Sequence, residues 1–228
     1  MPHSSAHAPR RRLVVATNNS SKLAEFRSLL AGLPFELQSM GELGLASPEE
    51  SGASFLANAL LKARHAATAA AAMPALGSPD GRRDTTAAAL ADDSGLEVEA
   101  LGGAPGIFSA RYAGRNADDG ANNAKLLAAL QGLPLQQRRA RYRCALALVF
   151  EAEDPQPVVA EGVWEGYILD TPRGAGGFGY DPYFWLPELG LTAAQLVSEH
   201  KNRFSHRGIA IRALRQQLIA RQVASVSK

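Results

Sequence analysis

Apolar residues in the first forty positions follow two patterns. Residues 12–17 (RLVVAT) and 35–40 (FELQSM) have the length and composition of strands. Between them, residues 22–32 (KLAEFRSLLAG) carry apolar side chains three or four positions apart and end at a glycine, which is typical of a helix. The polar residues 18–21 precede that helix. The pattern therefore predicts a strand, a turn, a helix and a second strand.

The same two patterns recur along the rest of the chain. Residues 47–72 combine a polar lead with a long helical repeat, and residues 116–130 predict another helix. Residues 141–150 and 158–169 are apolar strands separated by the polar segment EAEDPQP, which predicts a hairpin. Residues 192–218 are helical with one internal break. Strands mixed with helices in this way predict an α/β fold.

A cluster of polar residues that could bind a ligand follows a short apolar run at residues 87–91. Asp92 and Asp93 come next and would lie at the end of a buried strand, where open α/β sheets bind ligands. Successive strand residues point to opposite faces, so only one of the two carboxylates can face a given cleft. Ser94 and Gly95 would then turn the chain and expose backbone N–H groups. The segment suits a hard cation carrying phosphate, but an ordinary strand end fits it equally well.

The polar turn before the first helix is a candidate anion site. Free N–H groups and the helix dipole favour phosphate there, and Lys22 adds a positive charge. The glycines and the GK[ST] ending of a Walker loop are missing. A generic strand, turn and helix gives the same pattern.

Two acidic residues, Glu49 and Glu50, precede the long helix of residues 47–72. The helix dipole explains negative charge at such a place, and a second oxygen ligand for a cation is the alternative. Residues 73–86 are rich in proline, glycine and alanine, so we expect a surface insertion without an assigned role.

Residues 173–187 (RGAGGFGYDPYFWLP) combine glycines with aromatic side chains and one aspartate. Flat apolar rings on such a loop could stack on a planar base, or they could fill the core at a tight corner. Further on, Ser205 is a candidate helix N-cap, which places His206 and Arg207 in the first turn. Cations oppose the helix dipole there, so this placement indicates a compensating ligand.

The amino-acid composition limits the classes of function that the chain can have. The chain has 228 residues, 46% of them hydrophobic, which is enough for a large core. Its 24 basic and 22 acidic residues nearly balance, which argues against binding to a nucleic acid polymer. The one cysteine, Cys144, lies in an apolar run and favours a reducing, cytoplasmic compartment. We expect no membrane span, and a disordered tail over residues 1–11.

Four segments in order resemble the inosine triphosphate pyrophosphatase family, whose members remove non-standard purine nucleotides. They are ATNNSSK at 16–22, ADDSGLEVEALGGAPGIFSARYAG at 91–114, GGFGYDP at 176–182 and SHRG at 205–208. The resemblance extends over residues 13–218. Ser21 departs from it, because many relatives have glycine before the motif lysine, and the segment 73–86 is longer than usual.

The resemblance implies a mixed α/β fold in which an elongated central sheet with flanking helices joins two lobes around a cleft. It implies one pyrophosphatase domain over residues 12–222 and a homodimer. Asp93 matches the catalytic aspartate, and Glu50 and Asp93 match the positions associated with Mg²⁺. The residues implied to bind substrate are Thr17, Asn18, Asn19, Ser20, Ser21 and Lys22 for the triphosphate, Ser94, then Phe178, Gly179, Tyr180 and Asp181 for the base, and Lys201, His206 and Arg207 for base and phosphate contacts.

Triphosphate hydrolysis depends on charge neutralisation and on the position of the attacking water, and Mg²⁺ needs only one or two carboxylates. The resemblance implies hydrolysis of ITP, dITP and XTP to a nucleoside monophosphate and pyrophosphate. Two alternatives stay open at this point. One is a Maf-like pyrophosphatase with a different base preference, and the other is a non-catalytic nucleotide-binding module.

Overall fold

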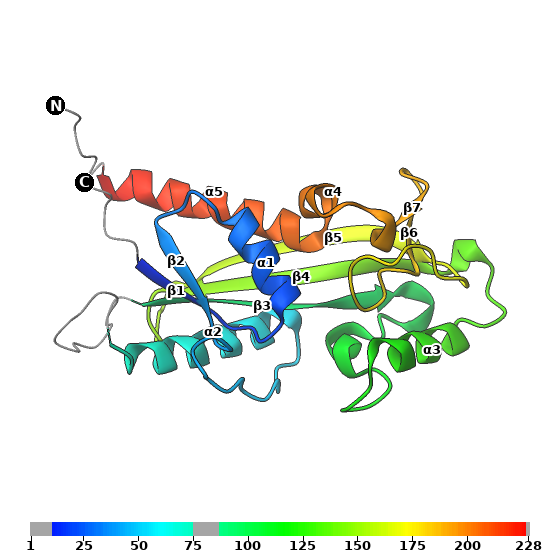
Figure 1. The fold of residues 1–228 in the computed structure, drawn as a ribbon, viewed down its shortest axis with the longest axis horizontal. Coiled ribbons are helices and arrows are strands. Elements are labelled where there is room, and N and C mark those ends of the chain that lie inside the picture. The colour runs from blue at the N-terminus through cyan, green and yellow to red at the C-terminus, as the bar shows by residue number, and fades with distance from the viewer. Residues whose placement is uncertain (1–10, 75–86, 227–228) are drawn as a thin grey trace. The chain divides into compact units, whose positions relative to one another are not determined.

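The computed structural model describes residues 11–74 and 87–226. Seven strands form one sheet in the order β2-β1-β3-β4-β5-β6-β7 (Figure 1). The strand β1 is parallel to β2 and β3, whereas β6 is antiparallel to β5 and β7. The sheet is therefore mixed, and the predicted α/β class is confirmed. The strands are β1 (Arg11–Val15), β2 (Phe35–Ser39), β3 (Ala88–Val98), β4 (Arg139–Val149), β5 (Val158–Ile168), β6 (Phe184–Leu186) and β7 (Leu191–Thr192).

The helices follow the predicted periodicity closely. They are α1 (Ser20–Leu29), α2 (Phe55–Ala71), α3 (Asp119–Ala129), α4 (Ser198–Phe204) and α5 (His206–Val226). The predicted break in the C-terminal helical segment is confirmed, because α4 ends at Phe204 and α5 begins two residues later. In the part of the chain that the structure describes, no helix combines the length and the apolar character needed to cross a bilayer.

The chain divides into two compact units, each built from separate segments. The first unit contains Met1–Asp92, Leu146–Ala160 and Leu214–Lys228, and the second contains Asp93–Ala145 and Glu161–Ala213. The division separates Asp92 from Asp93. The expected insertion at 73–86 lies outside the described residues except for its first two positions. The expected tail at 1–11 also lies outside them, except for Arg11, which begins β1.

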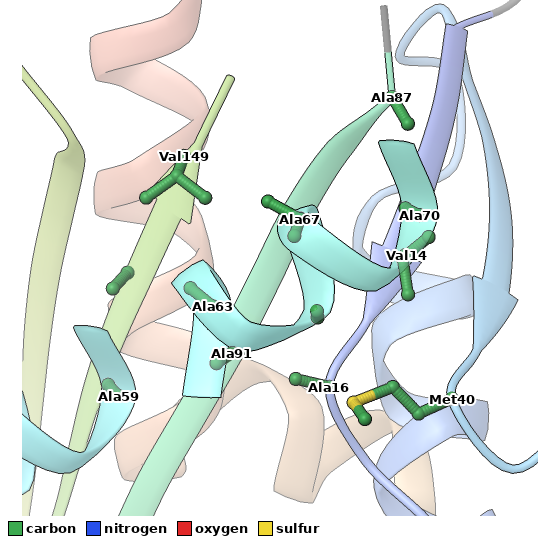
Figure 2. Packing of buried hydrophobic residues seen from close by; sticks show 13 residues of the cluster. Val14, Ala16, Met40, Ala59, Ala63, Ala67, Ala70, Ala87, Ala91 and Val149 are labelled. Carbon is green, nitrogen blue, oxygen red and sulfur yellow. The ribbon is translucent and has the colours of Figure 1, made fainter. Parts of the chain in front are cut away.

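The core of the first unit is made largely of alanine. The helix α2 turns a row of small side chains, spaced three or four residues apart, toward β1 and β3 (Figure 2). Because alanine has only one side-chain carbon, the helix backbone can lie close to the sheet. The row consists of Ala59, Ala63, Ala66, Ala67 and Ala70, all at most 2% exposed.

The core of the second unit combines aromatic rings with larger aliphatic side chains. Tyr142 from β4, Trp164 from β5 and Phe184 from β6 pack together, with ring centroids of the Tyr142–Phe184 pair 4.6 Å apart. The side chains of β5 alternate between core and surface, since Trp164 and Ile168 are buried while Val163 and Glu165 are exposed.

One local prediction is wrong. The strand β3 does not end at residue 91 but continues to Val98, and Gly95 is not among the glycines with positive φ. The apolar run resumes after the polar residues, since Leu96 and Val98 are both fully buried. The extended chain therefore passes through Asp92 and Asp93, and no turn exposes a cluster of N–H groups there.

Candidate active site

The turn between β1 and α1 is organised by its own side chains. The hydroxyl of Thr17 accepts a hydrogen bond from the N–H of Asn19, 3.1 Å away. The side chain of Asn19 in turn accepts from the N–H of Lys22 at 3.0 Å and caps α1. Residues 18–21 are exposed at this helix N-terminus. The arrangement leaves the start of α1 exposed to solvent, and the N–H groups at such a helix start are able to bind an anion.

A buried ion pair fixes the lysine of this turn. The ammonium of Lys22 lies 3.0 Å from a carboxylate oxygen of Asp92, which is only 2% exposed. Sequence reasoning gave no separate role to Asp92. Its partner lies seventy positions earlier, so the pairing carries no local sequence signal.

Glu50 also holds a lysine. Its carboxylate accepts from the ammonium of Lys62 in α2 at 3.0 Å. The helix dipole does not explain Glu50, because α2 begins at Phe55 with Ser54 as its N-cap. Lys62 has the helical spacing of the apolar positions of α2, and it is only 8% exposed. A cation in the buried stripe of a helix is the signal that could have revealed this pair.

No group of three or more His, Cys, Asp or Glu side chains that could hold a metal occurs within residues 11–74 and 87–226. Mg²⁺ does not need such a cage, because it commonly binds through one or two carboxylates, substrate phosphates and water. The carboxylates of Glu50 and Asp93 are donors of the right chemistry for it. Asp93 is 6% exposed, so a cation beside it would be well shielded from solvent.

In the second unit, the start of α5 brings the cation of Arg207 to β3. The hydroxyl of Ser205 accepts from the N–H of Gly208 at 3.2 Å, which confirms Ser205 as the N-cap. Arg207 is 1% exposed and donates from Nη2 to the hydroxyl of Ser94 at 3.1 Å. The structure thus brings together Ser94 and Arg207, two residues predicted to bind substrate.

The carboxylate of Asp181 is the centre of a second cluster in this unit. It accepts from the ammonium of Lys201 at 2.5 Å, from the N–H of Phe178 at 3.0 Å and from the hydroxyl of Tyr142 at 3.2 Å. The Lys201 ammonium also lies 5.1 Å from the centroid of the Phe178 ring. Three of the residues predicted to hold the base are therefore in direct contact.

The corner interpretation of the aromatic loop is confirmed for two of its residues. Tyr180 and Phe184 are at most 4% exposed and belong to the core, as the corner interpretation requires. Phe178 is only half-buried and lies between Gly177 and Gly179, both with positive φ. Its ring is accessible enough to take part in stacking.

Tyr142 connects this cluster to α5 and was missed by sequence reasoning. Its ring stacks on His206 with centroids 4.8 Å apart and an interplanar angle of 11°. Burial, reinforced by the charge of Asp181, raises the pKa of the Tyr142 phenol well above its ordinary range. The phenol therefore stays protonated and donates to Asp181. In an apolar strand such as β4, a tyrosine has the pattern of a core residue, so the local sequence does not distinguish it from one.

Comparison with known proteins places these residues in context. The model of the Ham1 family matches residues 13–217. A dITP/XTP pyrophosphatase of Xanthomonas campestris pv. campestris is 49% identical over 210 residues, which cover 92% of this chain and 98% of that protein. The dITP/XTP pyrophosphatase of Methylococcus capsulatus is 50% identical over 211 residues, with the same coverage.

Solved structures agree with the sequence comparison. A HAM1 protein from Coxiella burnetii has a TM-score of 0.79 and 43% identity, and covers 92% of this chain and 99% of its own. The Ham1 protein of Staphylococcus aureus has a TM-score of 0.77 and 37% identity, with coverage of 92% and 100%.

Proposed function

Because the chain belongs to the Ham1 family, we propose that it hydrolyses the non-canonical purine nucleoside triphosphates ITP, dITP and XTP to nucleoside monophosphate and pyrophosphate. Relatives that are about half identical over nearly their whole length carry the name dITP/XTP pyrophosphatase. The structural observation that carries the proposal is the cluster of Asp181, Lys201 and Phe178, in which charge and an aromatic face are presented together. A planar purine with polar edges is the ligand such a cluster suits.

The triphosphate is assigned to the turn of residues 17–22. The N-terminus of α1 supplies N–H groups and a favourable dipole, and Lys22 supplies a positive charge. Asp92 holds the Lys22 ammonium in place, which reduces the entropy lost when phosphate binds.

Mg²⁺ is the proposed cofactor, with Glu50 and Asp93 as its protein ligands. When bound, the ion neutralises phosphate charge and stabilises charge that develops in the transition state. Lys62 holds the Glu50 carboxylate in place through their ion pair. The Asp93 carboxylate orients or deprotonates the water that attacks the α-phosphorus, and pyrophosphate leaves.

Base selection is assigned to His206 and Arg207. Hypoxanthine and xanthine present an oxygen acceptor at position six beside N7, and an arginine pairs well with that edge. Adenine presents an amino donor there instead. An unmatched buried donor can reduce the specificity constant by roughly 10⁴. The exclusion of guanine has to act at its two-amino group.

The proposal includes a homodimer in the cytoplasm. A reducing compartment agrees with Cys144, the single cysteine of the sequence, whose side chain is buried.

A coupled phosphate assay tests the proposed function. Purified protein is incubated with Mg²⁺ and ITP, XTP, GTP or ATP, and orthophosphate is measured before and after inorganic pyrophosphatase is added. We expect phosphate only after that addition and only with ITP and XTP. Direct release of phosphate, or a preference for ATP or a pyrimidine triphosphate, would contradict the proposal and favour a Maf-like or other phosphohydrolase.

A further inference from the structure

The loop of residues 178–181 is attached to the first turns of α3 through Gly179. The N–H of Gly179 donates to Oδ2 of Asp119 at 2.6 Å. The carbonyl oxygen of the same glycine accepts from the amide nitrogen of Asn123 at 2.9 Å. Both backbone polar groups of Gly179 are thus bound by side chains that lie about sixty positions earlier in the chain.

Asp119 and Asn123 are suited to act as a pair. They are four positions apart, so their side chains lie on the same face of α3. The amide nitrogen of Asn123 also donates to the carbonyl of Asp119 at 2.8 Å, which uses its second hydrogen and fixes the orientation of the amide. Asn123 is 8% exposed, whereas Asp119 is exposed.

The glycine that they hold has a conformation that needs support. Its φ is +63°, in the left-handed region, and the neighbouring Gly177 has a φ of +74°. Two glycines of this kind on either side of Phe178 leave the backbone there with many accessible conformations when nothing restrains it. The carboxylate of Asp181 binds the N–H of Phe178 from one side, and α3 binds Gly179 from the other.

We propose that Asp119 and Asn123 are positioning residues for base binding. They fix Gly179, and through it they hold the Phe178 ring and the carboxylate of Asp181 in the arrangement that receives the purine. This inference rests on the proposed function, because it assumes that residues 178–181 bind the base. Neither residue is required to touch the base or the phosphates.

A matched pair of adjacent aspartates provides the test. Asp118 caps α3 by accepting from the N–H of Ala121 at 2.7 Å, whereas Asp119 binds the loop. We expect Asp119→Ala to raise KM for ITP about tenfold, the equivalent of one charged hydrogen bond, and to change kcat by less than about twofold. Asp118→Ala should lower the melting temperature and leave KM unchanged.

A conservative variant separates the hydrogen bond from the charge. Asp119→Asn retains an acceptor oxygen for the N–H of Gly179, so we expect it to recover most of the affinity lost in Asp119→Ala. Asn123→Ala should raise KM in the same direction as Asp119→Ala. An unchanged KM in Asp119→Ala, or equal KM values in Asp119→Asn and Asp119→Ala, would overturn the proposal.

Amide hydrogen exchange of the nucleotide-free protein gives a readout that does not depend on turnover. We expect exchange at residues 178–181 to be faster in Asp119→Ala than in the wild type and unchanged in Asp118→Ala. Equal exchange in the two variants would overturn the positioning role even if KM changed. Failure of the wild type to hydrolyse ITP or XTP would instead refute the proposed function, while the exchange comparison would still decide whether α3 holds the loop.

Discussion

Asp92 and Asp93 are adjacent, buried carboxylates in β3. Their residue type and their place after an apolar run predicted a site, and the structure places both in buried positions of β3. The partner of Asp92 could not be predicted, because the ion pair with Lys22 depends on the packing of β1 beside β3. The sequence contains the residue types of a site, whereas the partner of a buried charge depends on the fold.

Asp93→Asn tests the catalytic assignment. We expect kcat for ITP to fall by about 10² to 10⁴, because the amide cannot accept a proton from water, while the melting temperature stays close to that of the wild type. Asp92→Asn is the matched comparison. It weakens the hold on Lys22, so its main effect should be a higher KM. Steady-state kinetics on both variants make the check, and near-normal turnover by Asp93→Asn would refute the assignment.

The buried phenol of Tyr142 predicts a loss of stability in alkaline solution. Its pKa in the folded chain is raised well above the ordinary value of 10.0, so the unfolded chain loses this proton first. The folded state then binds more protons, and the free energy of unfolding falls as pH rises above the unfolded pKa. Below that pH the contribution is constant.

Denaturant unfolding at several pH values between about pH 9 and about pH 11 measures this fall in the free energy of unfolding. The interval is centred on the ordinary phenol pKa. The wild type should lose stability more steeply over that interval than Tyr142→Phe, which has no phenol proton. Equal slopes for the two proteins would show that another group controls the alkaline transition.

At the scale of elements, periodicity predicted the helices and most strands, because burial of one face decides those segments. It failed at β3, where the polar residues after position 91 predict the end of a strand that continues to Val98. Ser94 is accommodated there by Arg207, whose side chain arrives from α5, more than a hundred positions later. How far a strand continues through polar residues therefore depends on long-range contacts, which a local sequence pattern does not contain.

Gly162 in β5 marks a close approach that sequence reasoning did not single out. A Cβ at this position would overlap the carbonyl oxygen of His206 and crowd the N–H of Ala210, both backbone atoms of α5. We expect Gly162→Ala to destabilise the protein by about 1–3 kcal/mol, because α5 has to move away from the strand. It should also weaken ITP binding, since His206 and Arg207 move with that helix.

Gly120→Ala in α3 is the control for Gly162→Ala. A Cβ there would meet only Oδ1 of Asp118 at 3.3 Å, a side-chain atom that needs to shift by only a few tenths of an ångström, and alanine is the better helix former. Thermal unfolding should show a neutral or slightly stabilising change. Equal destabilisation by the two substitutions would contradict the packing explanation.

At the scale of the whole molecule, each compact unit is assembled from segments that are distant in the sequence. The strand order β2-β1-β3-β4-β5-β6-β7 could not be predicted from spacing, although the mixed α/β class could. The four ordered motifs predicted the family, because their order does not depend on how the segments pack. The expectation of one functional domain over 12–222 stays a prediction.

A fragment ending at Asp92 tests the consequence of this assembly. The first unit also requires Leu146–Ala160, and Val149 from that segment packs in its core (Figure 2). We expect residues 1–92 alone to lack a cooperative thermal transition by circular dichroism, whereas the full chain shows one. A fragment that melts cooperatively would refute this requirement.

Removal of divalent metal tests the proposed cofactor on the intact chain. We expect EDTA to abolish ITP hydrolysis without changing the far-ultraviolet circular dichroism spectrum, because Mg²⁺ is proposed to act on the substrate phosphates. Added Mg²⁺ should restore turnover. Full activity in EDTA would contradict the cofactor assignment and leave the substrate assignment intact.

The continuity of β3 through its two aspartates limits how this segment can change in length. Side chains of a strand alternate between faces, so one residue gained or lost before Asp92 would give each carboxylate the orientation of the other. Lys22 would then face the wrong neighbour even though every functional residue type was still present. Substitutions in the apolar run 87–91 should therefore be tolerated far more readily than insertions or deletions of a single residue, and the spacing itself is a functional property of the sequence.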